Sequence, residues 1–95
     1  MILSFRDRRT RAFATGNRIK EFSGFAGQAH KRLRILHLAK DLPTLRAIRS
    51  NRLEALKGDR KGQFSIRINE QWRICFEWPD GSPGPVNVEI VDYHD

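Results

Sequence analysis

Cysteine is scarce in this sequence, and Cys75 is the only one. A lone cysteine excludes an intrachain disulfide and agrees with a reducing compartment, so we expect the chain in the cytoplasm. It also excludes a zinc site, because one cysteine and the scattered His30, His37 and His94 do not have the spacing of zinc ligands. We therefore expect no metal and no cofactor.

Long hydrophobic runs are also missing. No apolar stretch approaches the roughly 18 residues that are needed to span a membrane. The apolar start, Met1 to Phe5, is too short for a signal peptide, and charged residues follow it at once. The sequence therefore predicts a soluble protein without a membrane partner.

Acidic residues are outnumbered, since 11 Asp and Glu stand against 18 Lys and Arg, which gives a net charge of +7 and a pI of about 10.5. A positive field of this size favours polyanionic partners such as nucleic acid or acidic proteins. Part of the charge lies in a basic run from Arg6 to Arg11. This run is equally consistent with a solvated helix face and with a binding patch.

The 95 residues are expected to form one domain, residues 1–95, because a chain of this length has little margin for a second core. A short strand is predicted from Ile2 to Phe5. The main helix is predicted from Phe25 to Lys40, where apolar residues recur at spacings of three and four. Its buried stripe is expected to contain Ala26, Ala29, Leu33, Leu36, Ile35 and Leu38.

Pro43 is expected to stop this helix, and Asp41 can cap a short second helix that runs through Ile48. A strand is then predicted to begin near Arg52 and to end at the glycine-containing turn 57–62. The proline-rich segment 79–85 can only connect strands, because proline cannot donate to a ladder. The last strand should follow it, with its inward residues being Val86, Val88 and Ile90.

Together these elements predict an α+β domain. N-terminal helices pack on one face of a mainly antiparallel sheet of about four to five strands.

The clearest element is a β-hairpin from Gln63 to Trp78. Its apolar residues have the period of two that is typical of strands with one buried face. All of them occupy even positions: Phe64, Ile66, Ile68, Trp72, Ile74, Phe76 and Trp78. Both tryptophans are therefore expected in the core rather than as platforms for stacking bases.

The turn at 69–71 sets the register of this hairpin. Keeping Ile68 and Trp72 on one face requires them to pair across a three-residue loop, which places Arg67 opposite Arg73. Like charges that face each other destabilise a sheet, so a carboxylate, solvent or an anionic ligand must offset the repulsion.

The same alternation gathers polar residues on the other face of the sheet. These are Arg52, Glu54, Arg67, Arg73, Glu89 and Tyr93, with Lys57, Asp92 and His94 at the margin. Such a set suits metal-independent RNA cleavage, in which the 2′-hydroxyl attacks and the enzyme supplies a base, an acid and cations around the phosphate. The candidate bases are Glu54, Asp92 and His94, the candidate acids are His94 and Tyr93, and Arg73 with Lys57 can hold the phosphate charge.

Several motifs match one known family. Leu56-Lys57-Gly58-Asp59-Arg60, Ser65-Ile66-Arg67-Ile68-Asn69, Trp72-Arg73-Ile74 and Asp92-Tyr93-His94 resemble the HigB-type toxins of the RelE/ParE toxin-antitoxin superfamily. The resemblance covers nearly the whole chain and is most specific from Asn51 to His94. It implies helices packed on an antiparallel sheet and a ribosome-dependent endoribonuclease, an mRNA interferase that inhibits translation and growth.

The resemblance also implies roles for individual residues. Arg73 matches the arginine that stabilises the phosphate, and Asp92, Tyr93 and His94 match the C-terminal active-site run. RNA binding is expected of basic residues nearby: Lys57, Arg67, Arg52, Arg60 and Lys61. The chain departs from the pattern at Glu54, where some members have a catalytic histidine.

The implied partners are a HigA-type helix-turn-helix antitoxin, the ribosome with its mRNA, and operator DNA bound through the toxin-antitoxin complex. Arg8, Arg9, Lys31 and Arg34 are candidates for contact with an acidic antitoxin surface or with ribosomal RNA. Two alternative functions remain open. One is a gyrase-inhibiting ParE-like toxin without nuclease activity, and the other is a degenerate toxin that only binds antitoxin and operator, as Glu54 would allow.

Overall fold

A computed structural model describes residues 1–92 of the chain. Its helices are α1 (Arg8–Ala14), α2 (Ala26–Leu38) and α3 (Leu42–Ala47), with 3₁₀ turns η1 (Lys20–Phe25), η2 (Arg49–Asn51) and η3 (Gly58–Arg60). Its strands are β1 (Glu54–Ala55), β2 (Phe64–Arg67), β3 (Trp72–Glu77) and β4 (Val86–Asp92). No helix within these residues is long and apolar enough to cross a membrane.

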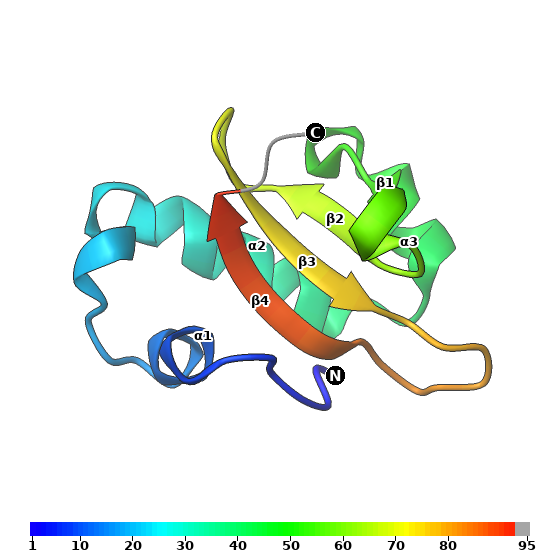
Figure 1. Cartoon of the computed structure of the whole chain (residues 1–95), viewed down its shortest axis with the longest axis horizontal. Coiled ribbons are helices and arrows are strands. Elements are labelled where there is room, and N and C mark those ends of the chain that lie inside the picture. The colour runs from blue at the N-terminus through cyan, green and yellow to red at the C-terminus, as the bar shows by residue number, and fades with distance from the viewer. Residues whose placement is uncertain (93–95) are drawn as a thin grey trace.

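The strands form one sheet in the order β1-β2-β3-β4, and each pair of neighbours is antiparallel. Helix α2 lies across one face of this sheet (Figure 1). The core fills the space between them, and its buried members include Ala29, Leu33, Leu36, Ile66, Ile74, Phe76, Val88 and Ile90. The predicted α+β architecture is confirmed. We call the sheet face on α2 the inner face and the opposite one the outer face.

The main helix is shorter than predicted. It ends at Leu38 because Ala39 adopts an extended conformation. Leu38 is therefore 64% exposed, and its expected place in the buried stripe is wrong. Pro43 does not stop this helix either. It lies in the first turn of α3, where its missing N–H costs nothing, and Asp41 caps α3 as predicted by accepting from the backbone N–H of Thr44 at 2.9 Å.

The predicted N-terminal strand is reduced to one parallel bridge between Phe5 and Val88. The segment still runs beside β4, since Val88 donates its N–H to Ser4 and accepts from Arg6. The strand stops there because Asp7 caps α1, with its carboxylate accepting from the N–H of Thr10 at 2.8 Å. Most of the basic run is thus helical, and α1 lies beside β4 (Figure 1).

Two further strand predictions are wrong in detail. The strand expected from Arg52 contains only Glu54 and Ala55, because Arg52 has a φ of 47° and cannot continue a ladder. The inward placement of Val86 also fails. The register of β4 shifts between Cys75 and Glu77, next to the positive φ of Asn87, so Val86 pairs with the outer-face residue Glu77.

The β2–β3 hairpin has the predicted register. Ile66 pairs with Ile74, and Arg67 pairs with Arg73. Beyond them the backbone N–H of Ile68 donates to Trp72, which closes the turn as expected. Trp72 packs against the aromatic rings of Phe22 and Phe25, so its place in the core is confirmed.

Candidate active site on the outer face of the sheet

Two rows of side chains cross the outer face. Glu54, Ser65, Cys75 and Glu89 pair one with the next across all four strands, and Arg67, Arg73 and Val91 form the adjacent row. Residues two apart along a strand are separated by roughly 7 Å, and neighbouring strands by about 4.8 Å. The Cα atoms of Glu54 and Arg73 are therefore about 12 Å apart. The long side chains of Glu54 and Arg73 can therefore both reach a phosphodiester group that lies between them.

The facing arginines share one acceptor. The carbonyl oxygen of Asn69 accepts from Nε of Arg67 at 3.2 Å and from Nη1 of Arg73. Arg67 Nη2 also lies 3.7 Å from the carboxylate of Glu70, which is 95% exposed. The predicted repulsion is thus offset by a backbone carbonyl and, more weakly, by an exposed carboxylate.

The other row contains an ion pair whose carboxylate is buried. Glu89 is only 7% exposed, and its carboxylate accepts from Nη1 of Arg60 at 2.8 Å. Arg60 also donates to Gln63 at 3.0 Å, and Nε of Arg6 lies 3.6 Å from Glu89. The guanidinium of Arg60, which we expected to bind RNA, therefore holds the η3 turn against β4. No pattern in the sequence indicates that Arg6 takes part in this network.

Cys75 lies in the middle of the same row and is fully buried. Burial raises the pKa of its thiol from 9.0 to about 11. The thiol is therefore protonated at neutral pH and a poor nucleophile.

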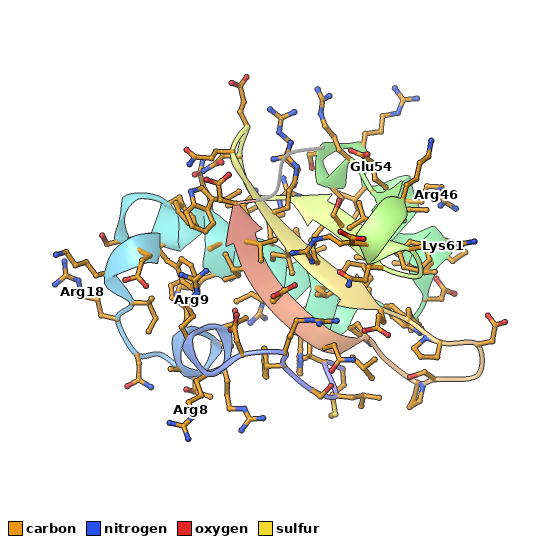
Figure 2. The ribbon with its side chains drawn as sticks, in the orientation of Figure 1. Arg8, Arg9, Arg18, Arg46, Glu54 and Lys61 are labelled. Atoms are coloured by element: carbon orange, nitrogen blue, oxygen red, sulfur yellow. The ribbon has the colours of Figure 1, made fainter. Side chains whose placement is uncertain are left out.

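The remaining cationic candidates lie around β1. Lys57 and Lys61 flank the η3 turn and are exposed, and Arg52 is exposed just before β1. Figure 2 shows Glu54 on this side of the molecule together with Lys61 and Arg46. Arg46, in the last turn of α3, is a further exposed cation on this side, which the strand pattern does not indicate because the residue lies outside the predicted strands.

The C-terminal candidates fall only partly within the structure. Asp92 pairs with Trp72, so it follows the inner-face register at the end of the sheet, and its carboxylate accepts from Nε2 of Gln71 at 2.8 Å. Tyr93 and His94 lie outside the described residues. Over residues 1–92, no three His, Cys, Asp or Glu side chains are grouped so that they could hold a metal ion.

The two histidines of α2 belong to a different surface. His30 stacks on Phe13 with ring centroids 4.0 Å apart, and Nδ1 of His37 accepts from the backbone N–H of Ile2 at 3.2 Å. Both line a cleft of about 480 Å³ among Ile2, Phe5, Ala14, Thr15, Leu33 and Arg34. Because α2 covers the inner face, neither histidine reaches the outer rows.

Comparison with known proteins gives concordant results. Residues 3–94 match the family model described as RelE-like toxin of type II toxin-antitoxin system HigB. Toxin HigB-1 of Vibrio cholerae serotype O1 is 35% identical over 83 residues, which cover 85% of this chain and 87% of that toxin. Endoribonuclease HigB of Proteus vulgaris is 44% identical over 43 residues, or 45% of each chain.

The fold also has a solved counterpart. The YoeB/ParE toxin from Agrobacterium tumefaciens superposes with a TM-score of 0.52 at 14% identity, over 95% of this chain and 96% of that one. At this identity the likeness concerns the fold alone.

Proposed function

Since the chain belongs to the RelE-like HigB toxins of type II toxin-antitoxin systems, we propose that it is an endoribonuclease that cleaves mRNA on the outer face of its sheet. Toxins of this family act with an antitoxin partner. The relative from Proteus vulgaris is named an endoribonuclease, which supports the assignment of an enzymatic activity.

The proposed reaction is cleavage by the 2′-hydroxyl of the substrate RNA. The hydroxyl attacks the adjacent phosphorus, a base removes its proton, and an acid protonates the departing 5′-oxygen. Glu54 is the proposed base because its carboxylate is exposed on the outer face. The acid is assigned to the C-terminal run of Asp92, Tyr93 and His94. Arg73, assisted by Lys57, stabilises the charge that grows on the phosphate.

The arrangement of Arg67 and Arg73 is the observation that carries this proposal. Two guanidinium groups face each other on one surface, and the described hydrogen bonds of Arg73 go only to the backbone carbonyls of Asn69 and Trp72. Its charge is therefore not neutralised by a carboxylate within residues 1–92. Paired guanidinium groups that retain N–H donors are well suited to bind a phosphate.

The proposed substrate is mRNA on the ribosome. The site has few proton-transfer groups, and positioning by a larger assembly can supply much of a rate enhancement. Exposed cations near β1, including Lys61 and Arg46 (Figure 2), would contact ribosomal RNA or an acidic antitoxin. The antitoxin is proposed to be of the HigA helix-turn-helix type, which carries the complex to operator DNA.

Inducible expression without antitoxin, combined with mapping of mRNA 5′ ends, tests this function. Wild type should arrest growth and produce new 5′ ends within translated messages. Arg73→Ala should abolish both, whereas Arg18→Ala, at an exposed position away from the outer face, should not. DNA damage with intact mRNA would favour a gyrase inhibitor, and unaffected growth would favour a degenerate toxin.

A further inference from the structure

The turn between β2 and β3 is organised by Asn69. Its side-chain Oδ1 accepts from the backbone N–H groups of Gln71 at 2.8 Å and Trp72 at 2.7 Å. Its own N–H donates to the carbonyl of Trp72 at 3.3 Å. Asparagine is common in such turns because its side chain can replace a backbone acceptor. These three bonds fix the orientation of the Asn69 peptide unit.

The backbone carbonyl of Asn69 makes further hydrogen bonds that the turn itself does not require. That oxygen accepts from the guanidinium groups of Arg67 and Arg73, which come from the two strands that the turn joins. Hydrogen bonds from a charged donor are roughly twice as strong as neutral ones. The backbone orientation set by the Asn69 side chain therefore decides where both cations are held.

The hydrogen bonds of Arg73 involve one nitrogen of its guanidinium group. Its Nη1 donates to the carbonyls of Asn69 and Trp72. A guanidinium has five N–H donors, and in the described part of the chain no hydrogen bond occupies Nε or Nη2 of Arg73. This Nε–Nη2 edge can make a two-point contact with phosphate oxygens.

We propose that Asn69 is a positioning residue for RNA cleavage. Its side chain fixes the backbone carbonyl that anchors Arg73. The Nε–Nη2 edge of Arg73 is then directed at the substrate phosphate. The proposal rests on the proposed nuclease function. Asn69 itself does not contact the reacting atoms.

A graded series of substitutions separates this role from others. Asn69→Asp keeps an acceptor at the same position, Asn69→Ser offers a weaker one, and Asn69→Ala removes it. Cleavage of mRNA on translating ribosomes by the purified variants should fall in that order. The rate for Asn69→Ala should drop roughly 10- to 100-fold, because a displaced catalytic group costs a factor of this size. Asn69→Asp should lose the least of the three, because it keeps the acceptor of the turn.

Loss of stability alone must be excluded. Asp41→Ala removes the cap of α3, which lies outside the hairpin, and serves as a control that destabilises the fold without removing a described contact of either arginine. At a temperature where both variants are folded, Asp41→Ala should cleave at the wild-type rate. A comparable drop in both variants would overturn the proposal.

A double-mutant cycle tests whether Asn69 acts through Arg73. In the Arg73→Ala background, Asn69→Ala should cause no further loss of cleavage. The side-chain Nε–H resonance of Arg73 supplies a second readout that does not depend on nuclease activity. The order parameter of this Nε–H bond should decrease in Asn69→Ala and be retained in Asn69→Asp.

The outcomes separate the two proposals. If Arg73→Ala cleaves like wild type, the proposed nuclease site is wrong, whatever Asn69 does. If Arg73→Ala is inactive while Asn69→Ala cleaves normally, or if the Arg73 resonance is unchanged in Asn69→Ala, the positioning role is wrong and the nuclease assignment survives.

Discussion

Arg67 and Arg73 face each other across the β2–β3 hairpin, and both side chains donate to the same carbonyl oxygen, that of Asn69. Facing like charges ordinarily weaken a sheet. Here one backbone oxygen attracts both guanidinium groups and keeps them on the outer face. The pair therefore concentrates positive charge where an RNA phosphate is proposed to bind.

Replacing Arg67 should affect RNA binding more than folding. Its ion pair with the exposed Glu70 is long, at 3.7 Å, and such pairs contribute little. Arg67→Gln should change the free energy of unfolding by less than about 1 kcal/mol. It should also reduce the slope of log affinity against log salt by about 1, since one phosphate contact is lost. Binding of RNA with 2′-O-methyl groups, which cannot be cleaved, measures this slope, and an unchanged slope would exclude a phosphate contact by Arg67.

Glu54 is the proposed base, so its removal should affect the chemistry alone. Glu54→Gln should slow cleavage by about 10²- to 10⁴-fold, the range for loss of a general base. Because Glu54 is exposed, the urea midpoint should not change. Asp80→Asn, at an exposed carboxylate in the segment between β3 and β4, is the matched control. If Glu54→Gln retains full cleavage, the base must be sought in Asp92 or His94.

The buried thiol of Cys75 predicts a loss of stability in alkali. Its pKa is about 11 in the folded chain against an ordinary 9.0, so unfolding does not change its protonation below pH 9. Between pH 9 and 11 the unfolded chain releases this proton and the folded chain keeps it. The free energy of unfolding should therefore fall, by up to about 3 kcal/mol. Urea titrations of wild type and Cys75→Ala should diverge over this interval, and parallel curves would contradict the prediction.

The pair of Glu89 and Arg60 should matter for stability because the carboxylate of Glu89 is shielded from water. Glu89→Gln removes the 2.8 Å ion pair between Glu89 and Arg60 and should cost about 1–3 kcal/mol in urea unfolding. The exposed pair of Glu21 and Arg9, at 3.4 Å, provides the comparison. Glu21→Gln should cost less than about 1 kcal/mol. Equal effects of the two substitutions would show that burial does not strengthen the Glu89 pair.

Gly84 has no room for a side chain. A Cβ at this position would lie 1.9 Å from the carbonyl oxygen of Met1, so the N-terminal segment would have to move away from the loop. Gly84→Ala should therefore destabilise the fold by about 1–3 kcal/mol. Gly27→Ala in α2 meets nothing within 4 Å and should be neutral or slightly stabilising. A melting temperature for Gly84→Ala at or above that of Gly27→Ala would contradict this expectation.

The hairpin could be predicted from sequence because its apolar alternation and its loop length indicate the same register. The alternation from Phe64 to Trp78 and the short loop allow only one register that keeps Ile68 and Trp72 on one face. The family motifs lie in the same region, so the arginine pair and its proposed role emerged together. The fold class followed from the order of helical and strand patterns, and the family assignment is confirmed by the match over residues 3–94.

The errors arose where local backbone geometry overrides side-chain pattern. Alternation around Leu53 suggested a longer strand, but the left-handed conformation of Arg52 ends it early. Apolar Leu38 fits the helical stripe, yet the helix ends at that residue. The network around Glu89 could not be foreseen, because Arg6 reaches it only after the N-terminal segment has docked beside β4.

The two edges of the sheet, at β4 and β1, are built in a way that limits self-association. Beside β4 the N-terminal segment and Thr10 of α1 occupy backbone donors and acceptors of Val88 and Ile90. On the other side β1 contains only two residues. Over residues 1–92, neither border therefore offers a long row of unpaired amides on which a strand of a second molecule could add. Such protection would help a toxin remain dispersed after it leaves its antitoxin, instead of polymerising through its sheet.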